Sequence, residues 1–283
     1  MIFGNFKIEI IPDTEFRLDG GAMFGIVPRS LWERVCPPDE SNRIRMQTNC
    51  LFIETTTERI LIETGMGEKW TEKQGKIYGI NRQKTFADSL IEKTGYKCED
   101  ITIVVNTHLH LDHAGGNTKP DENGKAVPVF PNARYFVSKA EYEHAENPTM
   151  RDRGSYITDD WRPLLETGQL ELKPENYEVV PDLTMQQMRG HNGSMQTVKI
   201  MSCGETFYSF ADLIPMTAHL PLPWIMGYDL FPLETLENKK KLLPQALKEN
   251  WLCFFYHDPK TPLCRLTEEN GKIKAELLEL EDV

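Results

Sequence analysis

Several features that mark common protein classes are missing from this 283-residue sequence. No apolar run reaches about 18 residues, which excludes a transmembrane helix and a membrane partner. The first residues alternate apolar and polar side chains and lack the basic start and apolar core of a signal peptide, so we expect a first strand and a cytoplasmic protein. No serine lies in a G-x-S-x-G motif and no phosphate-binding glycine loop is present, which argues against a serine hydrolase and a nucleotide-binding enzyme.

Positive charge is also scarce. The formal net charge is −11, and a field of that sign repels phosphate backbones, so nucleic acid is not expected as a partner. The longest basic run, Lys239–Lys241, is interpreted as a solvated face of a helix.

The six cysteines form no C-x2-C pair, which excludes a zinc ribbon and a thioredoxin-like motif. Some of them, such as Cys50 and Cys253, lie in apolar, strand-like runs. We therefore expect free, largely buried thiols in a reducing compartment and no disulfide framework.

Strand-like and helical patterns alternate along the chain without repeats or a long linker, which predicts one domain over residues 1–283. Residues 1–45 are interpreted as an N-terminal extension that could cover the site or form a dimer interface. Two strands are expected within 46–67, and a short, charged tail after 258. The other expected strands are 101–105, 134–138, 177–185, 196–203, 205–212 and 251–258, and the expected helices are 84–95, 139–147 and 233–250, the last interrupted at Pro244. Strands separated by helices in two halves fit two sheets with helices outside.

The sharpest motif is HLHLDH, which follows the predicted strand IVV and precedes Ala114-Gly115-Gly116. It places four imidazole and carboxylate groups, the ligands that zinc, iron or manganese accept, within six residues. The four are His108, His110, Asp112 and His113. The glycines let the backbone turn tightly beneath the site and start the next helix.

Further ligands are expected at later strand ends, because one short motif leaves coordination positions open. His191 lies in a turn between two strands, Asp212 ends the strand FYSFA, and His257 ends the strand LCFFY. Each is followed by turn residues, as a site built on loops requires.

These segments in this order, HLHLDH, GH, AD and HDP, resemble the metallo-β-lactamase superfamily from the Glu63-Thr64-Gly65 loop to His257. The resemblance implies an αββα sandwich of two mixed β-sheets flanked by helices. It also implies two metal ions: His108, His110 and His191 would hold one, Asp112, His113 and His257 the other, and Asp212 would bridge them. Glu63 stands where an aspartate is usual in the family, and it is expected to act behind the ligands.

Two divalent cations about 3.5–4 Å apart can share a hydroxide that attacks the substrate. We expect Zn²⁺, with iron, manganese or cobalt as alternatives. Asp112 could both bind metal and pass a proton to the leaving group.

Two segments, Leu18–Gly25 and Ala211–Trp224, resemble the branch that contains N-acyl homoserine lactone lactonases (quorum-quenching enzymes) and methyl parathion hydrolase-like enzymes. This implies a small-molecule lactone or ester substrate with an apolar part. His219 is a candidate catalytic or supporting residue. The lactonases have a tyrosine three residues after the bridging aspartate, where this chain has Pro215. The candidate substrate pocket consists of Met23, Phe24, Trp224, Met226 and Tyr228.

Four functions follow from these observations. The leading one is a di-metal hydrolase that opens lactones or cleaves related esters, and the second is a phosphotriesterase or arylesterase of the same fold. The others are a mononuclear iron enzyme like the sulfur dioxygenases and a metal-stabilised binding protein without activity. A homodimer is compatible with the sequence.

Overall fold

The computed structural model describes residues 1–278, which form two compact units. The first unit comprises residues 1–14 and 48–175, and the second comprises residues 15–47 and 176 onward. Among the described residues no helix is both long and apolar enough to cross a bilayer.

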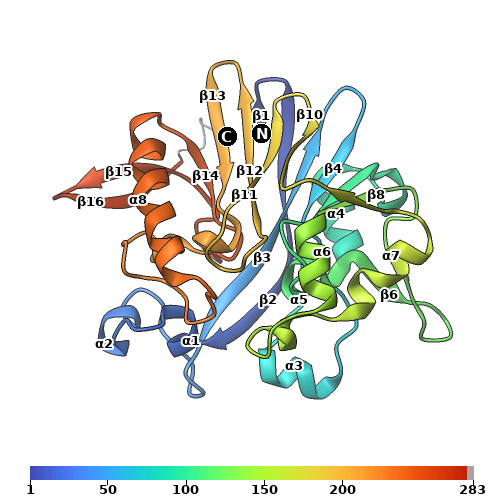
Figure 1. Ribbon diagram of the computed structural model, residues 1–283, viewed down its shortest axis with the longest axis horizontal. Helices are drawn as coiled ribbons and strands as arrows, with labels where there is room; N and C mark the ends of the chain where they lie inside the picture. Colours follow the sequence, from blue (N-terminus) through green and yellow to red (C-terminus); the bar gives the residue numbers. More distant parts are fainter. Residues whose placement is uncertain (279–283) are drawn as a thin grey trace. The chain divides into compact units, whose positions relative to one another are not determined.

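The first unit is built on a seven-stranded sheet with the order β1-β2-β3-β4-β5-β8-β9 (Figure 1). Neighbours from β4 to β9 run parallel, whereas β1 with β2 and β3 with β4 pair antiparallel, so the sheet is mixed. The strands are β1 Ile2–Phe3, β2 Phe6–Asp19, β3 Arg43–Glu54, β4 Arg59–Ile62, β5 Ile103–Val105, β8 Arg134–Ser138 and β9 Leu170–Lys173. Both β2 and β3 continue along the chain into the second unit.

Short helices connect these strands. α6 packs against β8 and β9 and buries Glu141 and Ala145. A small hairpin of β6 Thr118–Pro120 and β7 Ala126–Pro128 follows the histidine-rich motif. The helices are α3 Glu72–Tyr78, α4 Phe86–Thr94, α5 Leu111–Ala114, α6 Lys139–Glu146 and α7 Arg162–Glu166.

The second unit contains a seven-stranded sheet in simple sequence order, β10 to β16. It is antiparallel except where β13 and β14 run parallel, because α8 forms the crossover between them. Its strands are β10 Asn176–Val180, β11 Leu183–Gln187, β12 Gln196–Ser202, β13 Glu205–Ser209, β14 Leu252–Phe254, β15 Leu263–Glu269 and β16 Lys272–Leu277. Its helices are α1 Gly20–Phe24, α2 Arg29–Trp32 and α8 Pro232–Lys248.

The prediction of two mixed sheets with helices is confirmed, and most predicted elements are present. The strand expected at 101–105 starts two residues later, at Ile103. The strand expected at 205–212 ends at Ser209, and residues 211–213 form a 3₁₀ turn instead. Residues 177–185 form parts of two strands rather than one, because Asp182 turns the chain with a φ of 71°. All six cysteines are free, as predicted, and Cys50, Cys253 and Cys264 are buried.

Three expectations are wrong. α8 is not interrupted at Pro244, because this residue is exposed and water can solvate the carbonyl that its ring leaves without a donor. Residues after 258 are more than a short, charged tail, because they contain the hairpin of β15 and β16. Lys239 is fully buried rather than part of a solvated face, while Lys240 and Lys241 are exposed.

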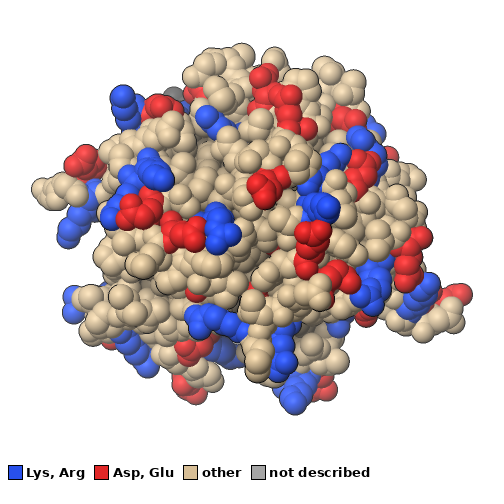
Figure 2. Space-filling view, viewed as in Figure 1, with Lys and Arg blue, Asp and Glu red and all other residues tan. Residues whose placement is uncertain are grey.

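Figure 2 shows lysine and arginine side chains interspersed with aspartate and glutamate over the face in view. On this face the two signs of charge are mixed (Figure 2).

Candidate metal centre

The histidine-rich motif spans the turn after β5 and the first residues of α5 in the first unit. His108 and His113 are fully buried and His110 is almost so, whereas Asp112 is only half-buried. The helix begins at Leu111, before the two glycines rather than after them as expected. A Cβ on Gly116 would lie 2.1 Å from the carbonyl oxygen of Thr64, so this position requires glycine for close approach to the 64–67 loop.

Glu63 controls the proton positions of two of these histidines. The hydroxyl of Thr107 donates to Glu63 and therefore accepts from Nδ1 of His108 at 3.0 Å. Nδ1 of His113 donates to the same carboxylate at 3.1 Å. In neutral rings this leaves the Nε2 lone pairs of both histidines available to a metal. The prediction that Glu63 acts behind the ligands agrees with these contacts.

A second carboxylate holds the backbone of the motif. Glu141 of α6 is fully buried and accepts from the backbone N–H of Leu109 at 2.8 Å and from the hydroxyl of Tyr156 at 3.1 Å. The Tyr156 ring packs edge-on against His110, with the centroids 4.7 Å apart. Glu141 and Tyr156 thus orient His110 from behind.

The loop after β4 is tied to the same motif and to β2. Lys69 donates to the carbonyl oxygens of Gly115 at 2.5 Å and Thr118 at 2.8 Å, and it pairs with buried Asp160 at 2.9 Å. Burial raises the pKa of Asp160 to about 6, although Lys69 opposes the shift. These contacts fix the segment that leaves the motif.

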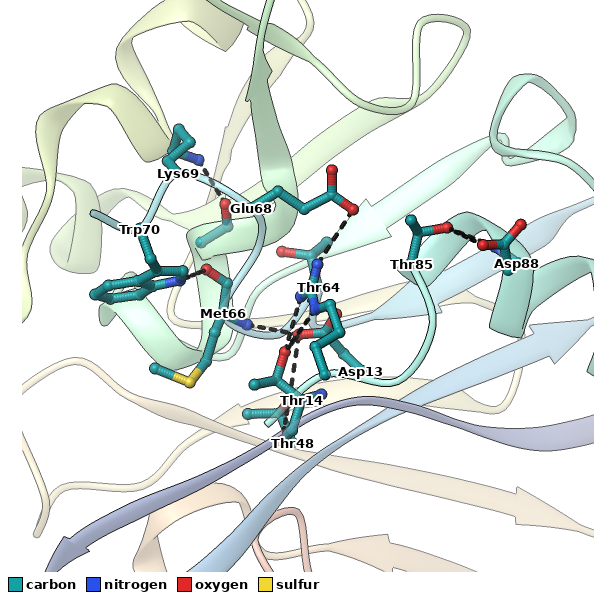
Figure 3. A network of polar contacts seen from close by, with 12 residues as sticks. Asp13, Thr14, Thr48, Thr64, Met66, Glu68, Lys69, Trp70, Thr85 and Asp88 are labelled. Atoms are coloured by element: carbon teal, nitrogen blue, oxygen red, sulfur yellow. Dashed lines mark hydrogen bonds and ion pairs between the residues drawn. The ribbon is translucent and has the colours of Figure 1, made fainter. Parts of the chain in front are cut away.

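Figure 3 shows how the other side of this loop is held. The carboxylate of Asp13 accepts from the backbone N–H of Met66 at 2.9 Å and pairs with Arg82 at 2.5 Å. Trp70 donates from its indole N–H to the carbonyl oxygen of Met66 at 2.7 Å. The loop that carries Glu63 is therefore fixed through polar contacts with β2 and with the segment before α4.

In the second unit three predicted ligands meet. Asp212 lies in a 3₁₀ turn after β13, and its two oxygens face two histidines. Nε2 of His191 lies 3.4 Å from Oδ2, and Nε2 of His257 lies 3.2 Å from Oδ1. All three side chains are at most 6% exposed. Ala211, just before Asp212, has a φ of 46°, which is unusual for a residue other than glycine.

The outer nitrogen of each of these histidines is anchored. Nδ1 of His191 lies 3.2 Å from Asp229, whose other oxygen accepts from Thr235, and Nδ1 of His257 lies 3.1 Å from the carbonyl oxygen of Gln47. A neutral ring that donates from Nδ1 has a lone pair on Nε2, so Nε2 and the Asp212 oxygens are all acceptors. A divalent cation satisfies such a set, and the donor chemistry therefore fits a metal.

His219 is packed inside the second unit. Its Nε2 donates to the carbonyl oxygen of Met23 at 2.9 Å, and its ring stacks on Phe24 with the centroids 4.7 Å apart. Burial lowers the pKa of His219 to about 4, so the ring is neutral at pH 7. These contacts support the turn that carries Met23 and Phe24.

Most of the predicted substrate-pocket residues lie together. Trp224 packs edge-on against Phe24 at 5.5 Å, and the backbone N–H of Gly227 donates to Ala22 at 2.8 Å, which joins the 225–228 segment to α1. Tyr228 is 40% exposed, whereas Met226 is buried.

Lys239, from α8, binds the loop of residues 219–224, which leads to the predicted pocket residue Trp224. Its ammonium group donates to the carbonyl oxygens of His219 at 2.6 Å, Pro221 at 2.8 Å and Trp224 at 2.9 Å. Burial lowers the pKa of Lys239 to about 7, with Asp229 opposing the shift.

The model of the metallo-beta-lactamase superfamily matches residues 43–191, which is more than half of the chain. The chain belongs to this superfamily. It is 27% identical over 237 residues to the N-acyl homoserine lactonase of Bacillus cereus, and the match covers 77% of this chain and 83% of that protein.

Solved structures agree with this assignment. A probable metal-dependent hydrolase from Staphylococcus aureus superposes with a TM-score of 0.90 at 28% identity, covering 99% of both chains. AidC, a dizinc quorum-quenching lactonase solved with N-hexanoyl-L-homoserine, superposes with a TM-score of 0.80 at 21% identity, covering 99% of this chain and 97% of its own. The predicted metallo-β-lactamase fold is confirmed, and the protein is a metal-dependent hydrolase.

Sequence reasoning missed several residues that support the proposed metal ligands and the loops around them. Glu141 and Asp229 carry no motif, and their roles depend on contacts with distant segments. Lys239 had a signal, since it lies on the helical stripe of Thr235 and Leu243, both of which are buried. His144 is half-buried, and its Nε2 lies 2.6 Å from a carboxylate oxygen of Asp152.

Proposed function

We propose that this metallo-β-lactamase superfamily hydrolase opens N-acyl homoserine lactones with two bound metal ions. The observation that carries the proposal is the arrangement of Asp212, with one carboxylate oxygen toward each of two histidines whose outer nitrogens are anchored. The lactonase relative from Bacillus cereus and the branch-like segments around residues 18–25 and 211–224 support the substrate class.

We infer that His108, His110 and His191 hold one cation, that Asp112, His113 and His257 hold the other, and that Asp212 contacts both. Zinc is the proposed metal, since histidine and carboxylate form its usual ligand set and the similar AidC is a dizinc enzyme. Two such cations would supply an activated water and polarise the carbonyl group of the ring.

The chain's own residues orient the histidine ligands and supply the proton to the leaving oxygen. Glu63 and Asp229 hold their histidine rings in the tautomer that presents Nε2. Asp112, the only half-buried member of the histidine-rich motif, is the proposed proton carrier to the leaving oxygen. The catalytic role considered for His219 stays a prediction; its contacts favour support of the Met23–Phe24 turn, which with Trp224, Met226 and Tyr228 is the proposed wall of the substrate pocket.

The test compares purified protein on N-decanoyl homoserine lactone, a paraoxon-type phosphotriester and an aryl ester at equal metal content. We expect the highest kcat/KM on the lactone, followed as acid release with a pH indicator. Asp112→Asn should retain the metals and lose most of the turnover, because an amide cannot deliver the proton. Faster phosphotriester turnover would replace the lactonase proposal with the phosphotriesterase alternative, and full activity of Asp112→Asn would remove its role. The cytoplasmic location and the homodimer stay predictions.

A further inference from the structure

The second unit contains a cavity of about 360 Å³ that the proposed reaction does not use. It lies between the segment after α2, the loop that follows Met216, the turn after His257 and β16, and none of the proposed metal ligands lines it. Its volume is at the lower end of the range for small-molecule sites, about 300–1,000 Å³. The cavity is therefore large enough for a ligand of its own.

One side of the cavity is apolar. The side chains on this side come from the 216–224 loop and from β16, which also packs on the unit's hydrophobic core. They are Met216, Leu220, Pro221, Trp224, Ile273 and Ala275. Such a wall gains free energy by covering an aliphatic chain, at about 25 cal/mol per Å² of apolar surface removed from water.

The carboxylate in the cavity lining, Asp258, already accepts hydrogen bonds from neighbouring residues of the protein. Asp258 accepts from the N–H and hydroxyl of Thr217 at 2.9 and 2.6 Å, and from the backbone N–H groups of Lys260 at 2.9 Å and Thr261 at 2.8 Å. It therefore fixes the loop and the turn that form the cavity.

The cavity lining contains three cationic side chains, Arg45, Lys260 and Lys274, and the one carboxylate of Asp258. Arg45 pairs with Glu15 at 2.7 Å, and Lys274 pairs with Glu269. Lys260 makes no ion pair with any residue from 1 to 278. A cation left unpaired beside an apolar cavity favours an anionic ligand at that point, against the repulsion from the chain's net charge of −11.

We propose that this cavity binds an amphiphilic carboxylate, with its aliphatic chain against the 216–224 loop and its carboxylate at Lys260. The inference does not depend on the proposed lactonase activity. Its ligand would be either a free fatty acid or the acylated acid that lactone opening releases. Because Trp224 lines the cavity and also packs on Phe24, an occupant would contact a residue of the proposed substrate wall.

The experiment is calorimetric titration of the metal-loaded protein with decanoate, 1-decanol and N-decanoyl homoserine below their micellar concentrations. We expect saturable binding of one decanoate per chain, about threefold or more tighter than decanol, as an exposed ion pair allows. Lys260→Gln should bring the two affinities together. Lys272→Gln, on an exposed lysine of β16 outside the lining, is the matched control and should change neither. Tighter binding of decanoate would identify a free fatty acid as the ligand, and tighter binding of N-decanoyl homoserine would identify the acid that lactone opening releases.

Filling the cavity separates specific binding from adsorption. Ala218→Trp should weaken decanoate binding at least about tenfold, because its indole would occupy the ligand's volume. If this variant does not fold, Val35→Trp serves instead, since Val35 lines the cavity and is 50% exposed. Unchanged decanoate binding in a folded cavity-filling variant, or no saturable binding to the unaltered protein, would overturn the proposal.

Discussion

The two groups of proposed metal ligands are held in different ways. In the first unit four ligands lie within six consecutive residues, and two buried carboxylates, Glu63 and Glu141, hold the motif through side-chain and backbone donors. In the second unit three ligands come from three separate segments and meet at one carboxylate, Asp212. The first group is contiguous in sequence, whereas the second is assembled around Asp212, with Asp229 and the carbonyl oxygen of Gln47 anchoring its two histidines.

Each group has one backbone position with a strained conformation. Glu63 and Ala211 are residues other than glycine with φ values of 63° and 46°. Such conformations cost about 1–3 kcal/mol and persist where surrounding contacts enforce them. Each therefore marks the point where its unit places a functional carboxylate.

The largest expected effect is at the shared carboxylate. Asp212→Ala should lower kcat/KM by roughly 10³-fold or more and reduce the metal content, because both proposed cations lose a ligand. Asp159→Asn, on an exposed aspartate of the first unit, is the control and should leave both unchanged. Steady-state kinetics with elemental analysis make the measurement; near-normal turnover and metal content in Asp212→Ala would contradict the proposal that Asp212 contacts both cations.

Lys239 supports the loop of residues 219–224 in the second unit from inside. Lys239→Met should lower the free energy of unfolding by about 2–4 kcal/mol, because a buried ammonium group is lost and the carbonyl oxygens of His219, Pro221 and Trp224 lose their donor, the first of them in a buried contact. Its exposed neighbour provides the control, since Lys240→Met should change stability by less than about 0.5 kcal/mol. Urea unfolding compares them, and equal midpoints would contradict the role of Lys239.

His219 makes the stability of the second unit sensitive to acid. Its folded-state pKa of about 4 lies below the unfolded value of about 6.5, so the unfolded state binds more protons between these pH values. The contribution is present above pH 6.5 and is lost as the pH falls towards 4, by about 3 kcal/mol in all. His219→Gln retains a donor for Met23 but cannot titrate. Unfolding midpoints of the two proteins should therefore converge or cross between pH 7 and pH 4, and parallel pH profiles would refute the assignment.

The smallest expected effects separate the two anchoring carboxylates. Glu63→Gln and Asp229→Asn should each weaken metal binding by about 10–100-fold, because each disturbs one histidine tautomer. Glu63→Gln should also lower stability more, by about 1–3 kcal/mol, because Glu63 accepts from Thr107, Asn106 and His113, whereas among residues 1–278 Asp229 accepts from Thr235 and His191 alone. Metal competition titrations and thermal unfolding distinguish the two, and equal stability losses would remove the contrast between the units.

The same contrast explains what could be predicted from sequence. HLHLDH was visible because its ligands are contiguous, and α4 was visible because its threonine cap, apolar spacing and terminal Gly95 are local. The supports of His191 and His257 were not, because Asp229 and Gln47 meet them only after folding.

Two of the errors had local signals. The hairpin of β15 and β16 turns at Asn270-Gly271, with φ values of 53° and 71°, and an Asn-Gly pair between alternating runs favours such a turn. Pro244 was given too much weight, since a proline on the exposed side of a long amphipathic helix can be accommodated when packing fixes both ends.

The most direct test of the central claim is the metal content of the purified protein, measured by elemental analysis alongside lactone hydrolysis. The account predicts two divalent ions per chain, predominantly zinc, and activity that is lost on chelation and restored when both ions are returned. One iron per chain, or full activity without metal, would contradict the proposed site.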